Sequence, residues 1–227
     1  MRTVLRSRRI VAENGIVDGV IEVEDGKIVR IGPAAGPVDF DFEGQRIIPG
    51  IIDIHNHGFG GWSMTDPAKE KDVKGFAKAV ASVGVTGVLP TAKEEAFEAI
   101  ADCTGQLLDG ARIYGVHSEG PFWARGGENT VGEDYPLPDV AEAQRLIDKA
   151  KGKMVMMAIA PELPKAYDVI RLLHQKGIKV ASAHTKAYAE DIRKAMDEVG
   201  LDIVTHLGNG MRGIHHRNVG ALGQYLL

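Results

Sequence analysis

The sequence contains little of what marks several large classes of protein. Its 227 residues include one cysteine, Cys103, so no disulfide bond can form within the chain and a reducing cytoplasm is the expected compartment. No apolar run reaches the length of about 18 residues that a membrane-spanning helix needs. Residues 1–5 lack the apolar core of a signal peptide. We therefore expect neither a membrane span nor a secreted, disulfide-bonded domain.

A strong charge of either sign is also lacking. The chain has 27 lysine and arginine residues against 31 aspartate and glutamate residues, a formal charge of −4. Its longest basic cluster is residues 6–9, which is more typical of a solvated strand face than of a nucleic-acid-binding tail. Nucleic acid is therefore not expected as a partner. With 44% of the residues hydrophobic, the chain can form one sizeable core and a small additional domain.

Residues 1–48 predict a small β-domain. Short apolar runs alternate there with turns, and Asp25-Gly26 separates the runs at 17–23 and 28–32. An Asp-Gly pair between alternating apolar runs is a strong signal for a β-hairpin. Nothing in this part of the sequence is typical of the start of a helical barrel.

Residues 49–227 follow a different rhythm, in which short apolar strands alternate with amphipathic helices. Strands are predicted at residues 48–54, 87–90, 112–117, 154–160, 179–183 and 203–207, and helices at 67–83, 93–108, 139–151, 163–175 and 187–199. Repeated βα units with fully apolar strands predict a parallel sheet covered by helices. The absence of a GxGxxG motif after the first strand argues against a dinucleotide-binding fold. The predicted class is α/β, a (β/α)8 TIM-type barrel that is incomplete here, with about six βα units before strands seven and eight.

Polar residues gather at the predicted C-terminal ends of the barrel strands, where the active sites of such barrels lie. His55 and His57 end the first strand with a spacing of two, so their side chains point to the same side. Glu119, His184 and His206 follow the third, fifth and sixth strands. We therefore expect these five side chains to converge on one point.

Four imidazoles and one carboxylate form a donor set suited to Zn²⁺, Fe²⁺, Mn²⁺ or Co²⁺. Five ligands exceed what one tetrahedral ion with an open position needs, so Glu119 is a candidate bridge between two ions. Such an ion lowers the pKa of a bound water toward neutrality and polarises a carbonyl group, which is the chemistry of metal-assisted hydrolysis. Each residue alone also has an ordinary interpretation: Glu119 as a loop carboxylate and His184 as a core histidine. For His117 the ordinary interpretation, a hydrogen-bonding side chain, is favoured.

Five motifs occur in order along the chain. They are Pro-Gly-Ile-Ile-Asp-Ile-His-Asn-His-Gly at 49–58, His-Ser-Glu-Gly-Pro-Phe at 117–122, Ser-Ala-His-Thr at 182–185, Thr-His-Leu-Gly-Asn-Gly-Met at 205–211 and His-His-Arg-Asn-Val-Gly at 215–220. The first resembles the first-strand signature of the amidohydrolase superfamily. Taken together, the five resemble the N-acetylglucosamine-6-phosphate deacetylase family within it, and the likeness runs from about residue 15 to the end of the sequence.

The resemblance implies an activity and a set of metal ligands. The activity would be the hydrolysis of N-acetylglucosamine 6-phosphate to glucosamine 6-phosphate and acetate. Glu119, His184 and His206 would hold the divalent ion that the whole family shares. His55 and His57 would complete a second site that only some members have.

The same resemblance implies how the substrate would be bound. Asn209 and Gly210 would meet it through side-chain and backbone polar groups, and Arg217 would pair with the sugar phosphate, which a guanidinium fork suits. In such enzymes the phosphate partners come from a neighbouring subunit, which implies a homodimer.

Three features depart from the family pattern. Residues 125–129 read Arg-Gly-Gly-Glu-Asn where the family has Gly-Ala-His, so Asn129 is the candidate to bond a sugar hydroxyl, and Glu128 is unexpected beside a phosphosugar. Residues 59–62, Phe-Gly-Gly-Trp, suggest a reshaped mouth. The family's catalytic aspartate follows strand eight, and this sequence ends at Leu227, after strand six. No catalytic residue is therefore expected among residues 1–227, and the chain alone is expected to be nearly inactive.

Two other functions stay open on the sequence. The first is another amidohydrolase acting on a cyclic amide or amidine, against which the lack of a lysine at the end of strand four argues. The second is a catalytically incomplete fragment that binds metal, or associates with a complementary chain, without turnover.

Overall fold

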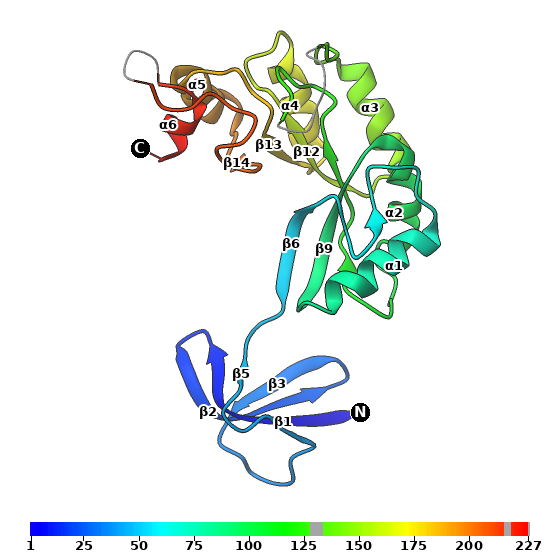
Figure 1. The fold of residues 1–227 in the computed structure, drawn as a ribbon, viewed down its shortest axis with the longest axis vertical. Helices are drawn as coiled ribbons and strands as arrows, with labels where there is room; N and C mark the ends of the chain where they lie inside the picture. Colours follow the sequence, from blue (N-terminus) through cyan, green and yellow to red (C-terminus); the bar gives the residue numbers. More distant parts are fainter. Residues whose placement is uncertain (128–133, 216–218, 227) are drawn as a thin grey trace. The chain divides into compact units, whose positions relative to one another are not determined.

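Two main β-sheets organise the chain, one in each of two units, Met1–Ile51 and Ile52–Leu227. The structure is a computed structural model and describes residues 1–127, 134–215 and 219–226 (Figure 1). The predicted fold class is confirmed: a small β-sheet at the N-terminus is followed by a partial parallel barrel.

The first unit is built on the hairpin that the sequence predicts. β2 (Gly15–Glu24) and β3 (Lys27–Gly32) pair antiparallel across the turn Asp25-Gly26. Both turn residues have a positive φ, 49° and 76°, which two-residue hairpin turns with an Asp-Gly sequence adopt. The remaining strands are β1 (Arg2–Ala12), which pairs with β2, and the short β4 (Phe40–Asp41) and β5 (Arg46–Ile47), which pair in parallel with β1.

The second unit is a curved sheet whose six barrel strands follow the order β6-β9-β11-β12-β13-β14. The pairings between β9 and β14 are all parallel. These strands are β6 (Ile51–Asn56), β9 (Val85–Ala92), β11 (Val116–Glu119), β12 (Met154–Ile159), β13 (Lys179–Ser182) and β14 (Ile203–Val204). Because successive strands run the same way, their C-terminal ends lie along one edge of the sheet.

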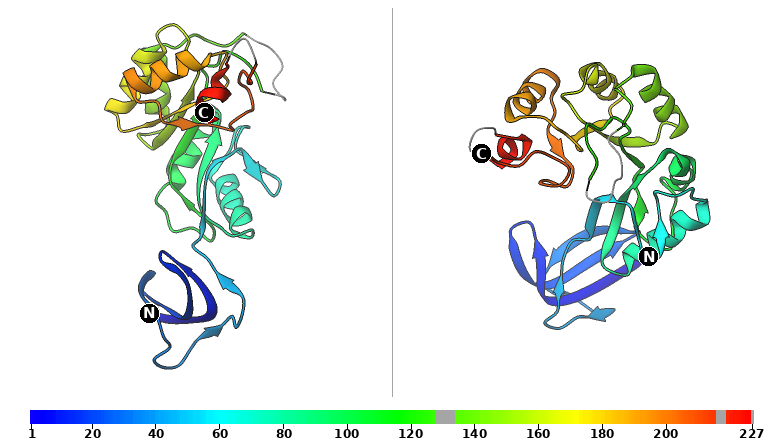
Figure 2. Two further views of the ribbon diagram at one scale, coloured as in Figure 1. Left: turned by 90° about the vertical axis from the view of Figure 1, so that its left-hand side faces the viewer. Right: turned by 45° about the horizontal axis from the view of Figure 1, so that its top comes forward.

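Helices cover the convex side of this sheet, as the right-hand view of Figure 2 shows. They are α1 (Glu70–Ala81), α2 (Phe97–Cys103), α3 (Val140–Lys149), α4 (Ala166–Gln175), α5 (Ala189–Val199) and α6 (Ala221–Leu226). The apolar faces of α1 to α5 and the sheet bury one large cluster that includes Phe76, Phe97 and Leu173, whereas α6 packs against α5 in a separate, smaller cluster. None of the helices in the described part of the chain is long and apolar enough to cross a bilayer.

Two predicted elements are each divided in the structure, and the ends of several others differ from their predictions by a few residues. The strand predicted at 112–117 is divided into β10 (Arg112–Ile113) and β11, because Gly115 between them adopts a φ of 148°. The helix predicted at 93–108 is a short 3-10 helix, η1 (Glu94–Ala96), followed by α2. It ends at Cys103 because Thr104 takes an extended conformation and its hydroxyl donates back to the carbonyl of Ile100 at 2.9 Å.

Candidate metal centre

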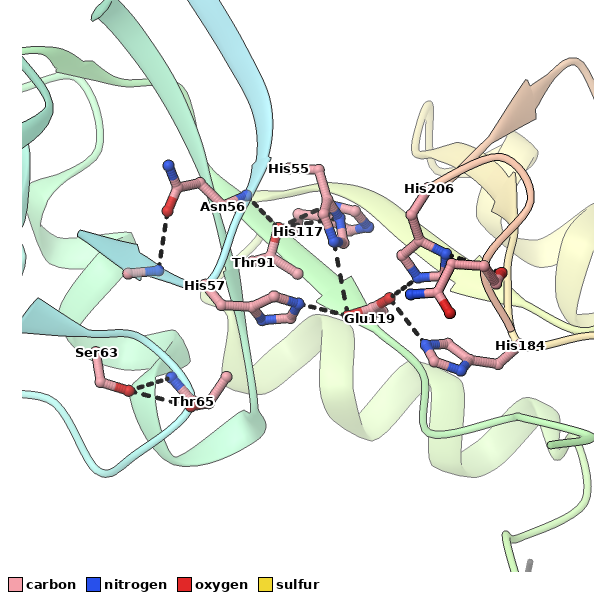
Figure 3. A network of polar contacts seen from close by, with 12 residues as sticks. His55, Asn56, His57, Ser63, Thr65, Thr91, His117, Glu119, His184 and His206 are labelled. Atoms are coloured by element: carbon pink, nitrogen blue, oxygen red, sulfur yellow. Dashed lines mark hydrogen bonds and ion pairs between the residues drawn. The ribbon is translucent and has the colours of Figure 1, made fainter. Parts of the chain in front are cut away.

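The five predicted donor residues come from four strands whose C-terminal ends share one edge of the sheet. Glu119 is the last residue of β11, and His55 lies in β6 with His57 directly after that strand. His184 and His206 follow the ends of β13 and β14. Figure 3 shows that all five side chains point toward one another, with Glu119 at the centre.

The two carboxylate oxygens of Glu119 face different pairs of histidines. Oε1 lies 3.0 Å from Nε2 of His184 and 2.7 Å from Nε2 of His206. Oε2 lies 2.7 Å from Nε2 of His57 and 3.8 Å from Nε2 of His55. The Glu119 side chain is only 6% exposed. One buried carboxylate is thus placed to bridge two adjacent sites.

Two of the histidines adopt backbone conformations that are uncommon for residues other than glycine. The φ angles are 48° at His184 and 36° at His206, both left-handed. Hydrogen bonds hold these turns: the carbonyl of His184 accepts from the N–H groups of Ala124 at 2.9 Å and Arg125 at 3.1 Å, and the carbonyl of His206 accepts from Asn209 at 2.8 Å. Strained backbone conformations of this kind persist only where contacts with the surrounding structure enforce them, and they cluster at functional sites.

A second layer of polar groups supports the β6 side of the centre. The hydroxyl of Thr91 accepts from the backbone N–H of Asn56 at 3.0 Å and lies 3.4 Å from Nδ1 of His55. It also lies 3.2 Å from Nδ1 of His117, which is equally close to the carbonyl of Ile54. His117 is fully buried. It therefore acts as a hydrogen-bonding side chain beneath the centre, in keeping with its predicted ordinary role.

The environment shifts several pKa values. Burial lowers the pKa of His55 to about 4 and that of His117 to about 3. Burial alone would raise the pKa of Glu119, but hydrogen bonds from three imidazoles outweigh it and hold that pKa well below its usual value. The hydrogen bond to Glu119 raises the pKa of His206. At neutral pH the centre therefore contains an ionised carboxylate, and the imidazole of His55 is neutral and can donate a lone pair to a metal.

The donor geometry fits a divalent metal ion. His55, His57 and Glu119 form one group and Glu119, His184 and His206 form another, with the donor atoms of each group within 4.8 Å of one another. Two donors that are each about 2.1 Å from a shared ion lie roughly 3.0–3.4 Å apart. The Glu119 oxygens lie at a similar separation, 2.7–3.0 Å, from Nε2 of His57, His184 and His206. Three protein ligands with an open position is the arrangement of catalytic zinc sites. The residues present therefore suit one or two such ions.

The two groups open into a cavity of about 630 Å³, a size that suits a small-molecule ligand. Asn209, which the sequence predicts to bind the substrate, lines this cavity and is exposed. Gly210 is buried instead, and its carbonyl already accepts a hydrogen bond from the N–H of Thr185 at 2.9 Å. The other predicted substrate residues, Arg217 and Asn129, and the unexpected Glu128, lie outside the described residues.

Three residues of this region were not predicted from the sequence. Lys93 and Trp123 line the cavity. Glu162 accepts from the hydroxyl of Thr185 at 2.6 Å and from the N–H of Lys186 at 2.5 Å, so it anchors the loop that follows His184. A signal for Glu162 was present, since it is a carboxylate shortly after the end of a predicted barrel strand.

Comparisons with known sequences point to one group of enzymes, although no protein-family model matches the chain. The chain is 33% identical over 227 residues to the N-acetylglucosamine-6-phosphate deacetylase of Vibrio furnissii, a match that covers 96% of this chain and 54% of that protein. It is 32% identical over 232 residues to the N-acetylgalactosamine-6-phosphate deacetylase of Escherichia coli O157:H7, covering 98% and 61%. The chain thus spans little more than half the length of these relatives.

Solved structures agree with the sequence relatives. The N-acetyl-D-glucosamine-6-phosphate deacetylase of Mycobacterium smegmatis, solved as a mutant in complex with N-acetyl-D-glucosamine-6-phosphate, superposes with a TM-score of 0.83 at 28% identity. That match covers 97% of this chain and 59% of the solved one. The N-acetylglucosamine-6-phosphate deacetylase of Pasteurella multocida, with a TM-score of 0.84 at 23% identity, supports the fold.

Proposed function

Because the chain belongs to the N-acetylglucosamine-6-phosphate deacetylase family of the amidohydrolase superfamily, we propose that the protein carrying it hydrolyses the N-acetyl amide of an amino-sugar 6-phosphate. The products would be acetate and the free amino-sugar phosphate. One observation carries the proposal: a single buried carboxylate, Glu119, faces two histidine pairs at the edge of the sheet where barrel enzymes bind their substrates.

In this proposal Glu119, His184 and His206 would hold one divalent ion, and His55, His57 and Glu119 would hold a second. Zinc is the first choice for imidazole and carboxylate donors at three-ligand sites. When bound, such an ion would polarise the amide carbonyl and activate water near neutral pH. The protein contributes the orientation of the donors: Nδ1 of His206 lies 3.2 Å from the carbonyl of Asn209, which leaves Nε2 facing the centre.

Deacetylation also needs a group that takes a proton from water and returns it to the leaving amine. In the two candidate metal groups found among the described residues, the only carboxylate is Glu119, which is a ligand in both. Asp53 accepts hydrogen bonds from the backbone N–H of His55 and the side chain of Asn56, so its carboxylate is engaged within β6. We therefore propose that the proton-transfer group is a carboxylate outside the described residues.

Substrate recognition would involve Asn209, which lines the cavity, and two residues outside the described part of the chain. Asn209 would bond the sugar, and the predicted roles of Arg217 toward the phosphate and Asn129 toward a sugar hydroxyl are part of the proposal. A homodimer that completes the phosphate site and a cytoplasmic location belong to it as well. The sugar is either N-acetylglucosamine 6-phosphate or its 4-epimer, N-acetylgalactosamine 6-phosphate, since relatives named for both substrates are similar to this chain.

The test is an acetate-release assay on the protein that carries this chain, first stripped of metal by a chelator and then supplied with zinc. Both N-acetylamino-sugar 6-phosphates and unphosphorylated N-acetylglucosamine serve as substrates. We expect zinc-dependent turnover of a phosphorylated sugar that His206→Ala abolishes and that His174→Ala, an exposed control on α4, leaves unchanged. Acetate release that survives both chelation and His206→Ala would overturn the proposal.

The phosphate role of Arg217 has its own test. Truncating one partner of a buried charge pair weakens binding by about 2–5 kcal/mol. Arg217→Ala should therefore raise KM for the phosphorylated sugar by at least about 30-fold and leave the unphosphorylated sugar little affected. Equal losses on the two substrates would remove this role.

A further inference from the structure

Trp123 stacks on one of the proposed metal ligands. Its ring lies nearly parallel to the imidazole of His184, with ring centroids 4.1 Å apart and an angle of 28° between the planes. Tyr135 meets the same indole edge-on at 5.2 Å. Trp123 follows Glu119 by four residues, so one short loop connects the carboxylate of this metal group to the indole that stacks on its histidine His184.

The loop that carries Trp123 is firmly placed. A Cβ added to Gly120, which has a φ of 90°, would lie 2.6 Å from Nε1 of Trp123, so a glycine is needed there to accommodate the indole. Phe122 is fully buried and its carbonyl accepts from the N–H of Ala160 at 2.9 Å. The N–H groups of Ala124 and Arg125 then bond the carbonyl of His184. The loop thus contacts both the backbone and the ring of that histidine.

His184 depends on this contact because it lacks the hydrogen bond that orients its neighbour. Metal-binding histidines usually donate their second ring nitrogen to an oxygen, which fixes the ring. Nδ1 of His206 has such a partner in the carbonyl of Asn209 at 3.2 Å. Nδ1 of His184 is buried and has no hydrogen-bond partner among the residues that the structure describes. The stacked indole therefore restrains rotation of this ring, alongside Glu119 at Nε2 and the edge-on ring of His206 at 4.9 Å.

We propose that Trp123 is a positioning residue, whose indole face holds the His184 imidazole with Nε2 directed at Glu119 and so raises the metal affinity of the Glu119–His184–His206 group. An imidazole bound to a cation is electron-poor and stacks more favourably on the electron-rich indole face than a free one. The indole thus favours the metal-bound form without touching the ion. This inference rests on the metal centre of the proposed function.

The experiment isolates one metal group at a time in the protein that carries this chain. His57→Ala disables the β6 group and leaves Glu119–His184–His206 to bind one zinc ion, whose affinity is measured by competition with a chelating dye. In this background Trp123→Leu should weaken zinc binding by about threefold to tenfold, the range expected for losing an aromatic stack, and Trp123→Phe should restore most of it. In a His184→Ala background, where the β6 group remains, Trp123→Leu should change nothing.

Tryptophan emission supplies a second readout. Residues 1–227 contain two tryptophans, and Trp62, which packs against Gly75 of α1, is removed by Trp62→Phe. The difference in emission between Trp62→Phe and Trp62→Phe/Trp123→Phe then reports Trp123. Zinc should change this emission with the same affinity as the Glu119–His184–His206 group, and His184→Ala should remove the change.

Three results would count against the inference. Equal zinc affinities with tryptophan, phenylalanine and leucine at position 123 would overturn it while leaving the metal centre intact. A similar loss in both single-group backgrounds would show that Trp123 acts on the fold and not on His184. Failure of the unaltered protein to bind zinc would overturn the metal centre itself, and this inference with it.

Discussion

Replacing Glu119 is expected to abolish both metal groups at once, whereas replacing a histidine abolishes only one. Oε1 of Glu119 faces His184 and His206, and Oε2 faces His57, so the carboxylate belongs to both groups of three donors. Glu119→Gln removes the charge and leaves each group with two histidines. We expect two zinc ions per chain in the unaltered protein, one in His57→Ala or His206→Ala, and none in Glu119→Gln.

The same logic predicts how much zinc stabilises each variant. A ligand present at 100 times its Kd stabilises the folded state by about 2.7 kcal/mol per site. For a domain of the size of Ile52–Leu227, 1 kcal/mol corresponds to about 2–4 °C in Tm. Zinc should therefore raise Tm by about 5–11 °C per intact site, about twice that with both sites, and hardly at all in Glu119→Gln.

The assay compares thermal unfolding of each metal-free variant with and without zinc, alongside metal counting by mass spectrometry. Reading the zinc-induced shift, and not Tm itself, separates metal binding from any effect of the substitution on the apoprotein. His174→Ala, exposed on α4, is the matched control and should keep the full shift. A Glu119→Gln variant that retains the full shift, or a His57→Ala variant that loses all of it, would refute the bridging role of the carboxylate.

Three further predictions concern stability. In the metal-free protein burial lowers the pKa of His117 from 6.5 to about 3, so the unfolded chain binds a proton that the folded one excludes. The neutral, buried form of His117 therefore makes its full contribution to the free energy of unfolding above about pH 6.5. This contribution should fall by about 2 kcal/mol between pH 7.5 and 5.0. In urea unfolding, the free energy of His117→Asn should accordingly depend less steeply on pH than that of the parent. Glu162→Ala leaves the hydroxyl of the buried Thr185 without its acceptor and should lower the free energy of unfolding by about 1–3 kcal/mol; equal urea midpoints for variant and parent would contradict this. Phe76→Ala opens a cavity in the α1 interface and should lower it by about 3–5 kcal/mol, against less than about 0.5 kcal/mol for Val83→Ala at an exposed position, both by urea unfolding.

The order of strands and helices could be predicted because the information for it is local. Apolar runs and amphipathic repeats record which side of each element is buried, and six parallel strands with intervening helices followed from that pattern. The Asp25-Gly26 turn was equally readable, because its residue types suit the positive φ angles that the hairpin adopts. Element ends were less predictable: α2 stops at Cys103 because Thr104 bonds back to the preceding turn, a competition that apolar spacing does not record.

The identity of the donors was also local information, because the rule that parallel strands end at a common edge turns positions in the sequence into positions in space. From that rule His55, His57, Glu119, His184 and His206 could be grouped before any distance was known. The rule does not say which way a side chain turns once it reaches the edge.

The sequence by itself determined the barrel architecture and the set of five donors, and the tertiary structure decided how those donors are divided and held. Glu119 meets residues 65 and 87 positions away, and the separate use of its two oxygens depends on the packing of four strands. The position of Trp123 on His184 likewise depends on tertiary packing, because the path of its loop is set by hydrogen bonds with Ala160 and His184, which follow the ends of β12 and β13. Local sequence patterns indicate which face of each helix or strand is buried. The orientation of the His184 and Trp123 rings, and the distances between the donor side chains, are set only when these elements pack together.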